Sequence, residues 1–137
     1  MKPKTMHALI QSAGHIDAHL IRAVVRQIGG WQSFTESAED VSNHGIDGGF
    51  HGFIYHSDTV PFGRRHRDLI IGFAKEMAED IGSDSVYSMI AGFNCVSLSA
   101  DEVAEALYNA RSENRTEVFN ALAWFIAEET CRAYADR

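Results

Sequence analysis

The chain has 137 residues, which suits a single globular domain over residues 1–137 that buries about two-thirds of the surface exposed on unfolding. Its composition, 45% hydrophobic and 23% charged, is typical of a folded protein and argues against a disordered chain. The formal net charge is −7, and the first residues lack the long apolar segment of a secretory signal.

The N-terminal part of the chain predicts three helices. We expect a short helix over residues 6–13. Residues 16–28 form a longer one, because apolar residues recur at every fourth position along them. The Gly-Gly pair that follows can adopt the left-handed conformation that a helix end often needs. A third, acidic helix is expected to start at a cap formed by Thr35 or Ser37 and to run to about residue 43.

Residues 44–60 interrupt the helical pattern with a run rich in glycine and histidine, for which we expect irregular backbone. His44, His51 and His56 are its candidate metal ligands, because three or four such donors can hold zinc. Their spacing matches no zinc-binding signature, so histidines that pack the loop through hydrogen bonds are the better explanation. We therefore predict neither a metal ion nor a cofactor.

Residues 61–81 predict a long amphipathic helix with a proline at its start. Its outward face is expected to carry Arg64, Arg67, Ile71 and Lys75. Arginines so near the start of a helix oppose the positive end of the helix dipole. Either acids elsewhere in the fold, such as residues 36–40, or a partner must then compensate for these charges.

The most apolar segment of the chain follows two further predicted helices and covers residues 118–127. Because its apolar residues point in every direction around a helix, it must be a central core helix with Trp124 buried. Its unbroken apolar run is far shorter than the roughly 20 residues of a membrane span. The sequence thus predicts a mainly α protein, a compact bundle of about six helices with one irregular segment at residues 44–60.

Cys95 and Cys131 have neither metal-binding nor redox spacing. Their residue type predicts buried thiols in a reducing cytosol, with one disulfide between them as the open alternative. Cys95 with a histidine could in principle form a nucleophile pair, but no flanking pattern supports it, so an inert thiol is favoured.

Acidic residues gather in the block 76–110, which contains no Lys or Arg. Its first members are Glu76, Glu79, Asp80 and Asp84. Such a block opposes direct binding to nucleic acid and suits a basic protein partner. The alternative is a solvated acidic face that only keeps the protein soluble.

Three short segments carry a resemblance: GFIYHSDT at residues 52–59, FNC at 93–95 and NALAWF at 120–125. They are similar to segments of small proteins of unknown function that bacteriophages and other mobile elements encode. The resemblance implies an accessory protein in the cytoplasm of a bacterial host, where many such proteins blunt host defences. It transfers no catalytic residue to this chain.

The leading hypothesis is a non-enzymatic binding protein that occupies a surface of a host protein complex. An inhibitor of host defence, of the anti-CRISPR kind, is one form of it, and a membrane partner is not expected. The residues expected to contact the partner are charged or lie beside charges: Glu76, Glu79, Asp80, Asp84, Arg64, Arg67 and Ile71.

Two alternatives come from other functional classes. A small hydrolase or transferase could use His51, Tyr55, His56 and Asp58 as acid–base groups, since histidine titrates near neutral pH. A self-associating structural protein could form a homodimer in which the arginine-bearing face of the 61–81 helix meets a neighbour's acidic helix.

Overall fold

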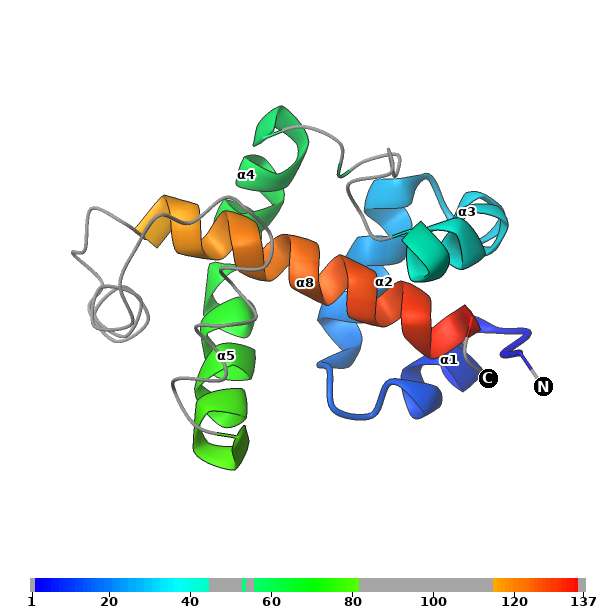
Figure 1. Ribbon diagram of the computed structural model, residues 1–137, viewed down its shortest axis with the longest axis horizontal. Helices are drawn as coiled ribbons and strands as arrows, with labels where there is room; N and C mark the ends of the chain where they lie inside the picture. The colour runs from blue at the N-terminus through cyan, green and yellow to red at the C-terminus, as the bar shows by residue number, and fades with distance from the viewer. Residues whose placement is uncertain (1, 45–52, 54–55, 82–114, 136–137) are drawn as a thin grey trace. The chain divides into compact units, whose positions relative to one another are not determined.

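The computed structural model describes residues 2–44, 53, 56–81 and 115–135, and side chains at 2–40, 53, 58–76 and 122–135. Within these ranges every regular element is an α-helix, which confirms the prediction of a mainly α protein (Figure 1). The helices are α1 (Met6–Ser12), α2 (Ala18–Ile28), α3 (Trp31–His44), α4 (His56–Arg65), α5 (Arg67–Ile81) and α8 (Arg115–Ala135).

The chain divides into two compact units. The first unit consists of Met1–Thr59 and Ile126–Arg137, and the second unit consists of Val60–Phe125. Helix α8 belongs to both, because its first part lies in the second unit and its last part in the first. That the chain folds as one domain stays a prediction.

Helix α2 forms the core of the first unit and packs against α1 and α3. Its buried side chains are Leu20, Ile21, Ala23, Val24, Val25 and Ile28. The helix begins at Ala18 because the Asp17 carboxylate accepts a hydrogen bond from the His19 N–H at 2.8 Å, which satisfies one of the free donors of the first turn. The prediction for residues 16–28 was thus correct except at its first residues.

Helix α3 begins earlier than the sequence predicted, at Trp31 rather than at a Thr35 or Ser37 cap. Gly29 and Gly30 have φ angles of 120° and 107°, and this left-handed pair turns the chain directly into the next helix. The Phe34 N–H then bonds to the Gly30 carbonyl at 2.9 Å. The Thr35 hydroxyl donates to the Gln32 carbonyl at 3.0 Å, so it serves within the helix instead of capping it.

The predicted helix over residues 61–81 is two helices. Helix α4 starts at His56, so Pro61 lies inside it, and a turn at His66 separates α4 from α5. Backbone hydrogen bonds continue across the turn, from the His66 N–H to the Phe62 carbonyl at 3.1 Å and from the Ile70 N–H to the His66 carbonyl at 3.0 Å. The turn therefore divides the predicted helix into two, but the backbone hydrogen bonding continues from one helix to the next. The helical start of α4 also shortens the irregular segment expected at residues 44–60.

Helix α8 confirms the predicted core helix from Leu122 onward, and the side chains of residues 118–121 lie outside those that the structure describes. Its side chains from Leu122 to Ala127 are buried, apart from a half-buried Phe125 that stacks on Phe73 in the second unit at a centroid distance of 6.1 Å. Trp124 is 8% exposed. In the part of the chain that the structure describes, no helix is both long and apolar enough to cross a membrane.

Candidate functional site

The end of α4 carries Arg64, one of the predicted partner-binding residues, in a setting that the sequence did not predict. Arg64 and Arg65 are exposed and lie in the last turn of α4. The carbonyl end of a helix is the negative end of its dipole, so these cations stabilise α4. The prediction that they oppose the positive end of a helix was wrong, because the break at His66 was not foreseen. They therefore need no compensating partner on this ground.

The predicted stripe of Arg64, Arg67, Ile71 and Lys75 spans two helices rather than one. Arg67, Ile71 and Lys75 follow each other at four-residue intervals on α5 and share one side of it. Arg67 is exposed and pairs with its neighbour Asp68, with 3.7 Å between Nε and Oδ1, and both side chains are mostly in solvent. Such a pair contributes little to stability, about 0–1 kcal/mol.

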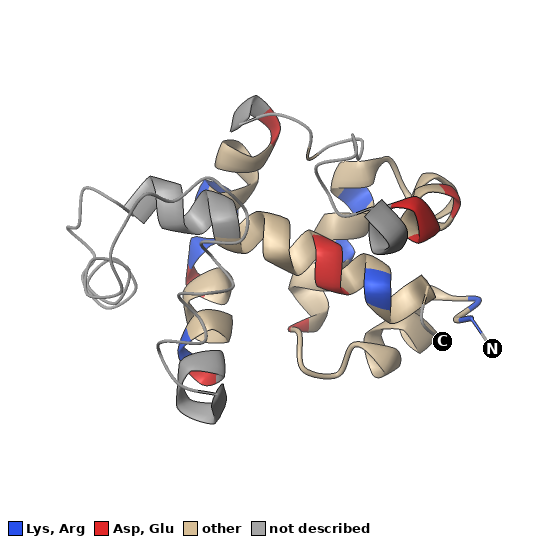
Figure 2. Cartoon of the chain, in the orientation of Figure 1, with Lys and Arg blue, Asp and Glu red and all other residues tan. Residues whose placement is uncertain are grey.

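Glu76, Glu79 and Asp80 of the predicted site lie toward the opposite end of α5 from Arg67, and Figure 2 shows an acidic segment of α5 toward that end. Glu76 is exposed, and Glu79 and Asp80 belong to the end of the helix, which has no basic residue in its last turn. Helical spacing brings positions 76, 79 and 80 to one side of α5. Acids at the negative end of a helix reduce its stability. Asp84 lies outside the described residues.

The residues proposed for an enzyme or a metal site are mostly beyond what the structure describes. His51 and Tyr55 lie outside the described residues, and only the backbone is described for His44, the last residue of α3, and for His56, the first of α4. Asp58 is half-buried in the first turn of α4, and its backbone carbonyl accepts a hydrogen bond from Gln27 Nε2 at 3.1 Å. The described residues contain no group of three or more potential metal ligands.

Cys131 has the environment of a structural thiol. It is fully buried and carries a free thiol, which agrees with the prediction of a buried thiol and excludes its disulfide with Cys95 in this structure. Burial raises the pKa of the Cys131 thiol well above its usual range, and the carboxylate of Glu128 raises it further. Because the thiolate is the reactive form, this cysteine is a poor nucleophile.

We expect Cys131 to react with iodoacetamide at pH 8 at least about 100-fold more slowly in the folded protein than in guanidinium chloride, because the folded protein holds almost no thiolate. Mass spectrometry of peptides separates its modification from that of Cys95. Equal rates for Cys131 in the two conditions would show that the thiol is accessible in solution.

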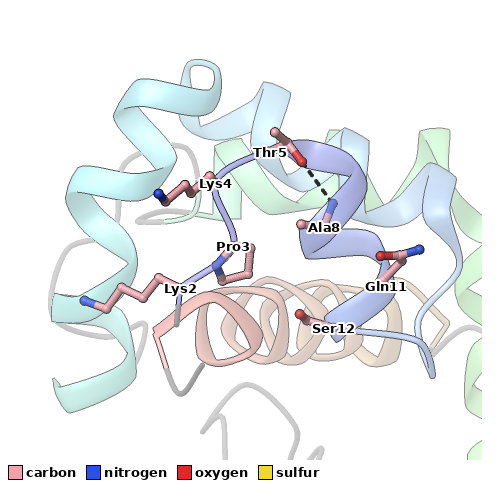
Figure 3. A pocket seen from close by; sticks show the side chains of 7 residues that line it. All are labelled: Lys2, Pro3, Lys4, Thr5, Ala8, Gln11 and Ser12. Carbon is pink, nitrogen blue, oxygen red and sulfur yellow. Dashed lines mark hydrogen bonds between the residues drawn. The ribbon is translucent and has the colours of Figure 1, made fainter.

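A hollow of about 520 Å³ lies beside the N-terminal segment and α1, lined by Lys2, Pro3, Lys4, Thr5, Ala8, Gln11 and Ser12 (Figure 3). Several of its polar groups already have partners. The Thr5 hydroxyl accepts a hydrogen bond from the Ala8 N–H at 3.1 Å, and Lys2 pairs with Glu39 and lies over the Tyr134 ring. Figure 3 shows Lys2 and Lys4 extending toward α3 and away from Gln11 and Ser12. The two cations therefore do not converge on one ligand position.

A second hollow, of about 500 Å³, lies in the first unit at the turn between α2 and α3. It is lined by Met6, Arg22, Val25, Arg26, Gly29, Gly30 and Trp31. Two exposed guanidinium groups and a half-buried indole ring thus share one recess. The sequence analysis missed this site, although two arginines four residues apart on one helix, followed by a Gly-Gly-Trp turn, were visible in the sequence.

No curated protein and no solved structure matches the chain. A family model described as Domain of unknown function (DUF7222) matches residues 15–137. The match includes every described helix except α1. The chain therefore belongs to the DUF7222 family.

Proposed function

We propose that the chain is a non-enzymatic binding protein that acts by occupying a surface of another protein. The observation that carries the proposal is the acidic end of α5, where Glu76, Glu79 and Asp80 stand at the negative end of a helix without a basic residue in the last turn. This arrangement lowers the stability of the helix, so the isolated fold does not account for it. A basic partner surface would turn the same charges into favourable contacts.

Basic and acidic residues are separated along α4 and α5, and this separation would orient a bound partner protein. Exposed arginines stand at the junction of the two helices, and Glu76, Glu79 and Asp80 stand toward the far end of α5. A partner with the complementary pattern would be attracted in one orientation and repelled in the reverse one. The basic and acidic sets lie on different sides of α5, because positions 67 and 76 are about half a turn apart around a helix, so the direct contact is assigned to the acidic set.

The more specific form of the proposal names the partner as a host protein complex. A defence complex that handles nucleic acid has basic grooves, and the acidic end of α5 would occupy one of them. In this version of the proposal, a bacteriophage or mobile element encodes the protein, and the protein acts in the bacterial cytoplasm. Its supports are the resemblance of the segments at 52–59, 93–95 and 120–125 and the net charge of −7.

The test compares two charge reversals of equal size on two different helices. Glu76→Lys with Glu79→Lys reverses the proposed surface, and Glu36→Lys with Asp40→Lys reverses two exposed acids of α3. Each protein is immobilised and incubated with bacterial lysate at low and high salt. We expect the α5 variant to lose proteins that the wild type and the α3 variant retain, and we expect high salt to release them.

Loss of folding is not expected to explain such a result, because lysine at the carbonyl end of α5 favours the helix. Circular dichroism and thermal unfolding of both variants check this point. If the α5 variant retains every protein that the wild type captures, the acidic end of α5 is not the partner surface.

A further inference from the structure

The hollow at the turn between α2 and α3 combines two cations that have no partner in the described part of the chain. Arg22 and Arg26 lie four residues apart on α2, so their side chains stand on the same side of the helix. Both are exposed and line the hollow, and no described residue forms an ion pair with either guanidinium group. Arg26 is in the last turn, where it favours the helix dipole, but Arg22 stands one turn earlier, where that effect is small.

The Gly29–Gly30 backbone at one side of the hollow leaves room for a ligand to come close to it. The Gly29 and Gly30 N–H groups are used within the turn, since Gly29 bonds to the Arg26 carbonyl at 3.1 Å and Gly30 bonds to the Val25 carbonyl at 3.0 Å. A Cβ atom built on Gly30 would have no heavy atom within 4 Å. The space beside Gly30 is therefore open, and the nearly fully buried Val25 supplies an apolar surface in the same recess.

Trp31 contributes an aromatic ring that two other aromatic rings hold in position. Its ring lies 5.7 Å from the Phe34 ring and meets the Tyr134 ring edge-on at 6.1 Å. Phe34 is fully buried, so this contact anchors the indole to the core while the indole remains half-buried and lines the hollow. An aromatic ring held in this way can stack on a flat ligand without first becoming ordered.

We propose that this hollow binds a mononucleotide, with its phosphate on Arg22 and Arg26 and its base against Trp31. Guanidinium groups match phosphate oxygens in a bidentate arrangement, and an indole stacks on any nucleobase. The volume of about 500 Å³ lies within the usual range for small-molecule sites. A long nucleic acid carries the same chemistry, but the net charge of −7 repels a polyanion more strongly than a single nucleotide.

Fluorescence of Trp31 measures this binding directly. The chain has two tryptophans, so Trp124→Phe leaves Trp31 as the only indole and keeps most of the core volume. Adenosine 5′-monophosphate should quench or shift the Trp31 emission with saturation. Adenosine, which lacks the phosphate, and ribose 5-phosphate, which lacks the base, should each bind at least about ten-fold more weakly. A single-stranded oligonucleotide should not bind more tightly than the mononucleotide.

A pair of double variants tests the assignment of the phosphate contact. In the Trp124→Phe background, Arg22→Gln with Arg26→Gln should weaken the binding of adenosine 5′-monophosphate at least about ten-fold. Lys4→Gln with Arg132→Gln removes the same charge from exposed positions that do not line the hollow and should leave it unchanged. Circular dichroism verifies that each variant is folded. The proposal is overturned if the nucleotide gives no saturable signal, if both double variants weaken it equally, or if the oligonucleotide binds more tightly.

Discussion

Replacement of Trp124 by alanine is expected to lower the free energy of unfolding by about 3–5 kcal/mol. Trp124 is 8% exposed and stands on α8 among Leu122, Ala123 and Ile126, which are buried more completely. The change removes a large apolar surface from the core and leaves a cavity that rigid helices fill only in part. A domain of this size has only about 5–15 kcal/mol of stability, so the loss should be visible as a much lower midpoint in urea.

Trp124→Phe is the matched control, because phenylalanine keeps an aromatic ring at the same position and leaves a smaller cavity. It should lose clearly less stability than the alanine variant, and both should be measured by circular dichroism in urea. An alanine variant as stable as the wild type would mean that Trp124 faces solvent. The apolar faces of α8 would then be candidates for docking another chain rather than parts of the core.

The buried part of α8 was predictable because its composition leaves it no alternative. A helix with apolar residues on every side cannot face water, so the segment around Trp124 had to be buried. Helix α2 was predictable for a related reason, since its apolar residues mark one side and Asp17 provides a cap. In both cases the hydrophobic pattern of a single segment is sufficient to predict its structure.

The helix boundaries were less predictable because several local signals compete. Thr35 is a good capping residue, yet the two left-handed glycines before Trp31 start α3 first, which leaves the Thr35 hydroxyl inside the helix. Neither His66 nor its immediate neighbours are glycine or proline, and the nearest such residues, Pro61 and Gly63, lie inside α4, so the sequence does not mark the position of the turn. Because of that turn, Arg64 and Arg65 stand at the negative end of the α4 dipole and stabilise the helix, whereas in one continuous helix they would stand near its positive end.

The hollow between α2 and α3 depends on tertiary packing that a pattern along one helix does not contain. The spacing of Arg22 and Arg26 places them together, but Met6 reaches the same recess only because α1 packs on α2. The orientation of Trp31 depends in turn on Tyr134, which is more than a hundred positions away in the sequence. Sequence reasoning could identify the two arginines, but not the aromatic surface beside them.

Replacement of Phe34 by alanine should destabilise the first unit by about 3–5 kcal/mol. Phe34 is fully buried on α3, and its ring lies 5.7 Å from that of Trp31 and 5.6 Å from that of Tyr134 in the last turns of α8. The side chain therefore connects α3 with the C-terminal part of the chain inside one core. Its loss creates a cavity and removes two aromatic contacts, each worth about 0.5–1.5 kcal/mol beyond the buried area. Thermal unfolding followed by circular dichroism measures the effect.

Phe34→Leu separates the two contributions, because leucine fills much of the volume but provides no ring. It should cost less stability than the alanine variant and still loosen Trp31, which in the Trp124→Phe background appears as a red shift of the tryptophan emission. If the alanine variant unfolds at the same temperature as the wild type, the aromatic cluster does not hold α3 against α8. A leucine variant with unchanged Trp31 emission would show that the backbone at Gly29 and Gly30, rather than the cluster, fixes the indole that lines the hollow.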